Sequence, residues 1–191
     1  WSSDVCSSDL VVIAVAAAAI LAVSVLSGGG TDVNAGGGMT PVQLDGTATG
    51  SAPTVGRPLP SQLAPGVDGT TVSLAALQGH PVWLTFGASW CQPCRAENPD
   101  VVAAYERHKG SGLVVVQVYM AEDAATVKDY TERVGIPYLA VPDPSEKLAN
   151  DFRILGIPTH YFIDADGILR EMKIGSLTPE AMDAALAGIG G

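Results

Sequence analysis

Two cysteines, Cys91 and Cys94, have the spacing that most plainly suggests chemistry. They form a Cys-x-x-Cys pair, while the third cysteine, Cys6, stands apart near the start. An apolar run typical of a buried strand, residues 81–86, comes shortly before the pair, and helical periodicity begins at Cys91. The free N–H groups and partial positive charge at a helix start stabilise an anion, so a thiol placed there ionises more easily. The pattern predicts a redox pair with Cys91 as the nucleophile.

Cys94 comes one helical turn after Cys91, close enough to close a small disulfide with it. A mixed disulfide between Cys91 and a partner could then be resolved by Cys94. A zinc site or two inert buried cysteines are the alternatives. Zinc usually takes four ligands, and the sequence has no second Cys-x-x-Cys. None of His80, His108 and His160 has ligand spacing with the pair. We therefore expect neither a metal nor a bound cofactor.

Hydrophobic patterning predicts the elements that position the pair. Strands are expected at 81–86 and 113–119 and in a hairpin, 159–163 and 168–174; helices are expected at 73–78, 91–109, 124–134 and 145–152, with a last one opened by Thr178 and Pro179. Alternating strands and helices give parallel strands, and the final hairpin adds an antiparallel edge. We predict an α/β fold with a central mixed β-sheet flanked by helices.

Four motifs together resemble the TlpA/ResA group of membrane-anchored, thioredoxin-like thiol–disulfide oxidoreductases. Residues 87–99, Gly-Ala-Ser-Trp-Cys-Gln-Pro-Cys-Arg-Ala-Glu-Asn-Pro, are similar to the active-site segment of that group. Residues 156–159, Gly-Ile-Pro-Thr, resemble its second motif. Segments 163–167 and 68–74 resemble its hairpin and its entry segment. The resemblance covers roughly residues 56–189 and implies a thioredoxin-like fold.

The resemblance also implies further parts of the site. Pro158 should be a cis-proline facing the cysteines, and Ile157 would present its backbone to the substrate chain. Trp90 would flank the site and contact the substrate. Glu97, three positions after Cys94 on the same helix face, would exchange the proton of the resolving thiol. The alternative for Glu97 is a solvated side chain that only complements the helix dipole.

Thr85 marks a departure from classical thioredoxins, which carry a buried Asp six residues before the first cysteine. Threonine cannot accept a proton at neutral pH, so this departure favours the TlpA/ResA group and strengthens Glu97 as the candidate acid. His160, just past Pro158, is interpreted as a packed or surface histidine rather than a catalytic one.

The chain is predicted to have four parts. We interpret residues 1–9, with Cys6, as an artefact or non-native start. Residues 10–26 are almost entirely apolar and span roughly 25 Å as a helix, the lower limit for a bilayer, so they predict a single-pass transmembrane anchor or a cleaved signal segment. Residues 27–55, rich in Gly, Ser and Thr, predict a flexible linker. Residues 56–191 form the thioredoxin-like domain, which either N-terminal interpretation places outside the cytoplasm.

The net charge of −10 makes the chain acidic, and its ten basic residues are scattered beyond residue 55. Such a surface has no electrostatic footprint for nucleic acid, so we expect no nucleic-acid partner.

The predicted function is an extracytoplasmic thiol–disulfide oxidoreductase that exchanges electrons with protein disulfides. The resemblance suggests a reductive role, such as keeping apocytochrome c cysteines reduced for haem attachment; the membrane electron donor or acceptor is unknown. One alternative is a thiol peroxidase, which would typically carry Thr-x-x-Cys, whereas Ala88 occupies the position three before Cys91. The other alternative is a redox-inactive module that holds peptides at Ile157–Pro158, although such a module has no need of an intact Cys-x-x-Cys pair.

Overall fold

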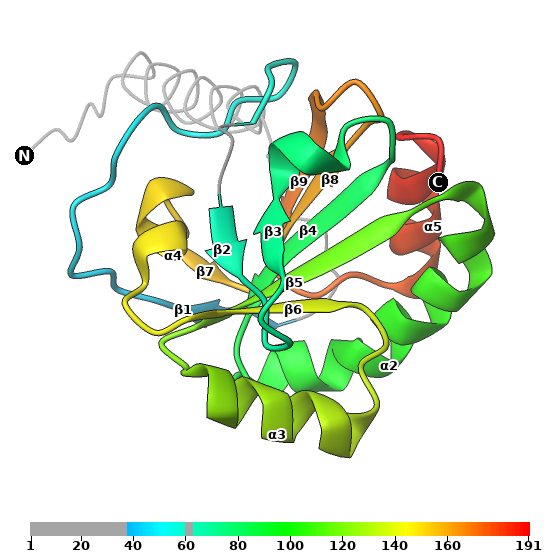
Figure 1. Ribbon diagram of the computed structural model, residues 1–191. Helices are drawn as coiled ribbons and strands as arrows, with labels where there is room; N and C mark the ends of the chain where they lie inside the picture. Colours follow the sequence, from blue (N-terminus) through cyan, green and yellow to red (C-terminus); the bar gives the residue numbers. More distant parts are fainter. Residues whose placement is uncertain (1–37, 60–62) are drawn as a thin grey trace, which may run out of the picture. The chain divides into compact units, whose positions relative to one another are not determined.

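The computed structural model describes residues 38–59 and 63–191 (Figure 1). The predicted anchor or signal segment at 10–26 and the first part of the predicted linker lie outside these residues. Within the described ranges, no helix has the length and apolar character needed to cross a membrane.

A five-stranded mixed sheet forms the centre of the domain, as the sequence predicts. Its strands, in spatial order, are β6 (Leu139–Asp143), β5 (Val114–Met120), β4 (Val82–Gly87), β8 (Thr159–Ile163) and β9 (Leu169–Ile174). The pairs β4–β5 and β5–β6 are parallel, whereas β4–β8 and β8–β9 are antiparallel. Every residue of β4 is buried, so the strand that leads to the cysteines has the sheet on both sides and side chains packed on both faces.

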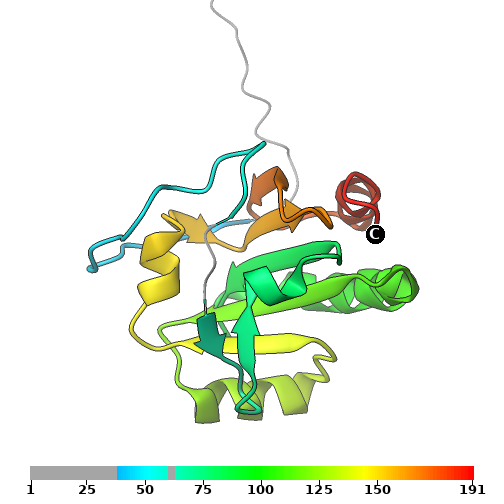
Figure 2. The same cartoon turned by 45° about the horizontal axis from the view of Figure 1, so that its top comes forward.

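The helices pack on the sheet through residues that alternate along the strands. The helical elements are α2 (Gln92–His108), α3 (Ala124–Val134), α4 (Lys147–Asp151) and α5 (Pro179–Ala187), with 3-10 turns η1 (Leu74–Leu77) and η2 (Lys109–Ser111). Trp83 and Phe162 belong to a buried cluster with residues of α2 and α5. Leu84 and Phe86 belong to a second cluster that includes residues of α4. Because successive strand residues face opposite sides, the two clusters mark the two faces of the sheet. Figure 2 shows α4, in yellow, and α5, in red, on opposite sides of the central strands.

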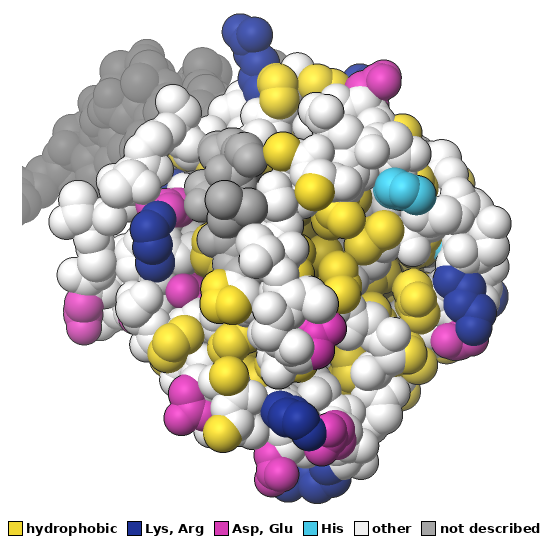
Figure 3. Space-filling view, viewed as in Figure 1, with side chains coloured by type: hydrophobic (Ala, Val, Ile, Leu, Met, Phe, Trp, Pro, Cys, Tyr) yellow, Lys and Arg dark blue, Asp and Glu magenta, His cyan; other side chains and the backbone are white. Residues whose placement is uncertain are grey.

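Local signals in the sequence set several of these elements. Thr178 caps α5 by accepting a hydrogen bond from the Ala181 N–H at 3.3 Å, with Pro179 at the first helical position, as predicted. A short hairpin, β2 (Leu63–Pro65) and β3 (Thr71–Ser73), forms around the expected turn. Apolar side chains gather over the middle of the face seen in Figure 3, with charged side chains mostly toward its rim.

Strand β6 was not among the predicted elements. It contains Pro142, which cannot donate to a strand ladder. The strand lies at the edge of the sheet, where a missing donor is tolerated. The proline therefore masked a real strand in the sequence pattern.

The predicted flexible linker must be corrected at its C-terminal end. Strand β1 (Thr40–Pro41) pairs antiparallel with β7 (Gly156–Ile157), and the Val42 N–H donates to Leu155 O at 3.2 Å. Val42 and Leu44 are half-buried against the core. Composition averaged over the segment hides these two apolar residues at alternate positions. We call residues 38–54 the N-terminal arm, and this part of the expected linker lies on the domain.

A second attachment holds the N-terminal arm farther along. The Thr49 N–H and hydroxyl both donate to Asp151 Oδ1, at 2.8 and 2.6 Å. The Arg153 guanidinium donates to Gly50 O at 3.0 Å. Figure 1 shows the arm running from beside β7 around the side of the domain that carries α4. The arm is thus held at both ends by contacts with the segment 151–157.

Candidate active site

Cys91 and Cys94 form a disulfide at the N-terminus of α2, with Cα atoms 5.3 Å apart. Cys91 is the N-cap residue, and its Sγ accepts a hydrogen bond from the Cys94 N–H at 3.2 Å. That N–H is one of the free donors of a helix start, so it would also stabilise a thiolate on Cys91. The geometry places Cys91 where the sequence predicted the more acidic thiol.

The Ile157–Pro158 peptide bond is cis, and it faces the disulfide across the site. Cys91 Sγ lies 3.8 Å from Ile157 O. Ile157 and Cys91 are both fully buried, and Cys94 is 3% exposed. The fold therefore brings together residues 66 positions apart in sequence, as the resemblance implied.

Glu97 is buried beneath the cysteines, not solvated. One carboxylate oxygen accepts a hydrogen bond from the Leu177 N–H at 2.6 Å. Burial raises the pKa of Glu97 from 4.5 to about 8; Asp100 adds to the rise, and the Leu177 bond opposes it. A carboxyl group with such a pKa holds a proton at neutral pH and titrates near the ordinary range of a thiol.

His160 lies fully buried between Trp83 and Glu97. The Trp83 indole N–H donates to His160 Nδ1 at 3.2 Å. An indole can only donate, so the proton of the neutral imidazole sits on Nε2. That atom lies 3.4 Å from Glu97 Oε1 and has no hydrogen-bond partner among the described residues. Burial lowers the pKa of His160 to about 3, so it is neutral beside Glu97.

Gly87, the last residue of β4, lies directly under the disulfide. A Cβ at this position would come within 3.4 Å of Cys94 Sγ and 3.3 Å of Gln117 Nε2. Thr85, two residues earlier, is buried on the same strand and pairs with His160 across β4 and β8. The place of the acid found in classical thioredoxins is thus filled by a packed strand residue.

The loop between β4 and α2 is tied to the end of the neighbouring strand. The Ser89 N–H donates to Glu122 Oε2 at 2.8 Å, and the Ser89 hydroxyl also bonds the Glu122 carboxylate. Glu122 is only 6% exposed. Because β4 and β5 are parallel, their carboxyl ends meet at one edge of the sheet, and this contact positions the loop that carries the cysteines.

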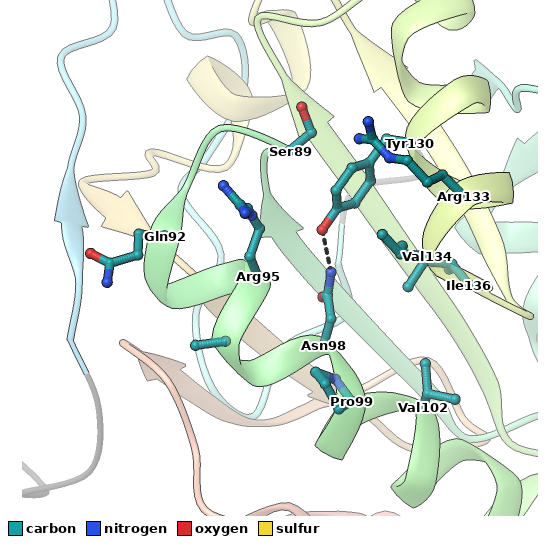
Figure 4. Close-up of a pocket in the computed structure, with 11 residues that line it drawn as sticks. Ser89, Gln92, Arg95, Asn98, Pro99, Val102, Tyr130, Arg133, Val134 and Ile136 are labelled. Carbon is teal, nitrogen blue, oxygen red and sulfur yellow. Dashed lines mark hydrogen bonds between the residues drawn. The ribbon is translucent and has the colours of Figure 1, made fainter.

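An open groove of about 980 Å³ runs beside the site between α2 and α3. Figure 4 shows Arg95 and Asn98 of α2 and Tyr130 and Arg133 of α3 around it. Asn98 Nδ2 donates to the Tyr130 hydroxyl at 2.8 Å, and the Arg133 guanidinium lies over the Tyr130 ring. Next to the groove's Ser89, Trp90 is half exposed, so its indole is open to a partner that approaches the cysteines.

A thioredoxin-like α/β fold that carries a Cys-x-x-Cys disulfide at a helix N-terminus, opposite a cis-proline, defines a thiol–disulfide oxidoreductase. The sequence profile of the AhpC/TSA family matches residues 55–172, and the chain belongs to this family. The resemblance to the TlpA/ResA group and the predicted oxidoreductase activity are both confirmed.

Known proteins with similar sequences carry the same activity in their names. The chain is 27% identical over 135 residues to thiol-disulfide oxidoreductase ResA of Bacillus thuringiensis, covering 71% of this chain and 78% of the relative. It is 30% identical over 128 residues to ResA of Oceanobacillus iheyensis, covering 67% of each chain. A thiol:disulfide interchange protein of the thioredoxin family from Chlorobium tepidum matches with a TM-score of 0.64 and 30% identity, over 75% of this chain and all of that one.

Sequence reasoning missed three features in and around this site. It treated His160 as packed or at the surface, but not as the neighbour of Glu97, because that contact depends on how β8 is placed relative to α2. It also missed the N-terminal arm, although Val42 and Leu44 gave a weak alternating signal. Glu122 had no signal at all, since only the parallel pairing of β4 and β5 brings it to Ser89.

Proposed function

We propose that this protein reduces disulfides of protein substrates outside the cytoplasm, with Cys91 as the nucleophile and Cys94 as the resolving thiol. The observation that carries the proposal is the position of Cys91 at the N-cap of α2, where it accepts the Cys94 N–H and faces Ile157 O. Trp90, next to Cys91 in sequence, and Ile157 and Pro158, across the site from it, would contact the substrate chain.

The exchange proceeds in two steps. The Cys91 thiolate attacks one sulfur of the substrate disulfide, and the other substrate sulfur leaves as a thiolate. Cys94 then loses its proton and attacks Cys91 Sγ, which releases the second substrate sulfur and forms the Cys91–Cys94 disulfide. Two electrons pass from the enzyme dithiol to the substrate, and a reductant must later restore the dithiol.

Glu97 would exchange the proton of Cys94. When the enzyme disulfide is reduced, an incoming thiolate attacks Cys91 and Cys94 leaves as a thiolate. A carboxyl group with a pKa of about 8 can protonate that thiolate and take the proton back when Cys94 next attacks. His160, whose Nε2 lies 3.4 Å from Glu97 Oε1, would help to orient the carboxylate.

The location and the partners rest on the sequence. An apolar segment at 10–26 would anchor the protein in the cell membrane, or direct its secretion, with the catalytic domain on the outer side. A reductase placed there could keep the cysteines of apocytochrome c reduced, drawing electrons from a membrane donor.

Trapping tests the roles of the two cysteines. In the Cys94→Ser variant the mixed disulfide cannot be resolved, so the full chain should accumulate a covalent adduct with a disulfide-containing protein, joined at Cys91. The matched control, Cys91→Ser, keeps Cys94 and should form none. Mass spectrometry of the non-reduced digest identifies the joined residue. An adduct at Cys94 in the control would overturn the assignment.

A further inference from the structure

The backbone edge that would receive a substrate chain is already occupied. Thr40 pairs with Ile157 and Pro41 with Gly156 in an antiparallel ladder, and Val42 continues it through its bond to Leu155 O. Figure 1 shows β1 lying alongside β7. An extended chain that sought the Ile157 backbone would meet β1 there, because a strand edge accepts one partner at a time.

The start of the N-terminal arm also lies over the Cys-x-x-Cys segment. The Ser176 N–H donates to Gly38 O at 3.3 Å, and the Ser176 hydroxyl lies 3.4 Å from Pro93 O, so the three residues meet at one point. A Cβ on Gly38 would be 3.7 Å from Pro93 Cβ. Gly38 and Thr40 line, together with Glu97, a cavity of about 460 Å³. The arm thus forms one wall of the space that Glu97 borders.

The disulfide is inaccessible in this arrangement. Cys91 has no exposed surface and Cys94 has 3%. Attack on a disulfide needs an approach to one sulfur, so a segment at the site must move. Helix α2 and strand β8 belong to the packed core, whereas the arm precedes the region matched by the AhpC/TSA family. The arm is the neighbour that can leave while the core stays intact.

We propose that Gly38–Val42 is an intramolecular occupant of the substrate site, and that an extended segment of the protein substrate displaces it and pairs with β7 in its place. The inference rests on the proposed function, in which the substrate chain meets the backbone of Ile157, and adds that the N-terminal arm must leave this edge before the chain can pair there.

The bound arm indicates which substrate segments fit. The position opposite Gly156 holds Pro41, so it needs no N–H donor. A Cβ at Gly156 would collide with Met39 Sδ, so the missing side chain leaves room for an apolar group at this point. Acidic or basic groups are not required, because the arm carries no charged residue between Gly38 and Leu44. The surface therefore fits an uncharged, extended segment with an apolar side chain near its cysteine.

Amide exchange in two covalent adducts tests displacement directly. The full-length Cys94→Ser variant is joined at Cys91 to an uncharged ten-residue peptide containing one cysteine, supplied as its mixed disulfide with thionitrobenzoate. The Cys91 thiolate attacks the peptide sulfur and releases thionitrobenzoate. The control adduct carries only a methylthio group, added with methyl methanethiolsulfonate. We expect the Val42 amide, bonded to Leu155 O, to exchange at least tenfold faster in the peptide adduct than in the control.

Any other result of this experiment contradicts either the inference or the proposed function. Equal protection of Val42 in both adducts overturns the inference and leaves the proposed function standing. Equally fast exchange in both adducts also overturns it, because the arm would then respond to any modification of Cys91 and not to a chain at β7. Failure of Cys91 to form either adduct overturns the proposed function, and the inference with it.

A proline pair of variants gives a kinetic test. Val42→Pro removes the N–H that bonds Leu155 O, and Thr49→Pro removes both the N–H and the hydroxyl that bond Asp151, away from the disulfide. Loss of one such bond should lower the occupancy of β7 by the arm about fivefold. The rate of peptide disulfide reduction should rise about as much in Val42→Pro and stay level in Thr49→Pro. Equal rates in the two variants would contradict the proposal.

Discussion

The Cys-x-x-Cys segment and the N-terminal arm meet at one site, but they are held there in different ways. The cysteines follow a strand whose every residue is buried, and their loop is tied to Glu122. The arm is attached by a two-residue strand and a few hydrogen bonds, and many of its side chains face solvent. The difference indicates that the reactive group is positioned by the core, whereas access to it is controlled by a segment that detaches at low cost.

The largest expected effect comes from a change in the Cys-x-x-Cys segment, which the core positions. Cys91→Ser should reduce disulfide exchange below detection, because a serine hydroxyl does not ionise to a nucleophile at neutral pH. Cys6→Ser is the matched control and should keep full activity, since that residue precedes the domain. The activity of both variants is measured as reduction of a protein disulfide, monitored through consumption of the reductant. Exchange that persists in Cys91→Ser would show that the N-cap sulfur is not the nucleophile.

A second change weakens the strand behind the cysteines. Phe86 is fully buried on β4 and packs against Phe152 and Tyr161, with ring centroids 5.0 and 5.9 Å away. Phe86→Ala should lower the free energy of unfolding by about 3–5 kcal/mol, through lost burial and the cavity left behind. Denaturant titration measures it. A loss under about 1 kcal/mol would mean that this strand is not the rigid support described here.

The buried Glu97 predicts a pH dependence of stability. Its pKa is raised from 4.5 to about 8, so between these values an unfolded chain releases the proton while the folded chain keeps it. Stability due to this group is therefore complete below pH 4.5 and declines by about 1.4 kcal/mol per pH unit until pH passes 8. Glu97→Gln should remove that decline.

His160 gives the opposite slope and serves as the internal comparison. Its pKa falls from 6.5 to about 3, so its contribution is present above pH 6.5 and is lost as pH falls toward 3. His160→Gln should flatten the acid side of the stability profile, whereas Glu97→Gln flattens the neutral side. Denaturant titrations from pH 4 to 9 compare the three proteins. Parallel profiles would show that neither group is buried as described.

The smallest expected effect lies in the arm. Leu44 is half-buried against the core, so Leu44→Ala should cost about 1 kcal/mol or less in global unfolding. Its effect should be local, visible as faster exchange of the Val42 amide. A global loss as large as that of Phe86→Ala would make the arm an integral part of the core and remove the contrast between the two regions.

The sequence could predict what depends on neighbours along the chain. The helix start at Cys91, the hairpin around residues 164–167 and the capping of α5 by Thr178 are all local patterns, and the structure contains each of them. The TlpA/ResA motifs added the cis bond before Pro158 and a proton-exchange role for Glu97 as expectations, whereas the burial of Glu97 is known only from the structure.

Contacts between elements that are distant in sequence could not be predicted from these local patterns. His160 meets Glu97 only because β8 pairs with β4 over the helix that carries the acid, 63 positions earlier in sequence. The arm is recognised by an edge, β7, that is itself only two residues long and has no pattern of its own. In both cases register decides the contact, and register is a property of the assembled sheet.

The two described tryptophans are fluorescent reporters in different environments, one buried and one exposed. Trp83 has no exposed surface, stacks on Phe162 and holds the imidazole that faces the acid, so its emission should follow ionisation of that carboxyl group and resist acrylamide quenching. Trp90 is half exposed beside the sulfurs, so its fluorescence should be quenched readily and should shift to the blue when a partner covers it. In a Trp1→Phe variant, one fluorescence spectrum could therefore distinguish ionisation of the buried carboxyl group from binding of a partner beside the sulfurs.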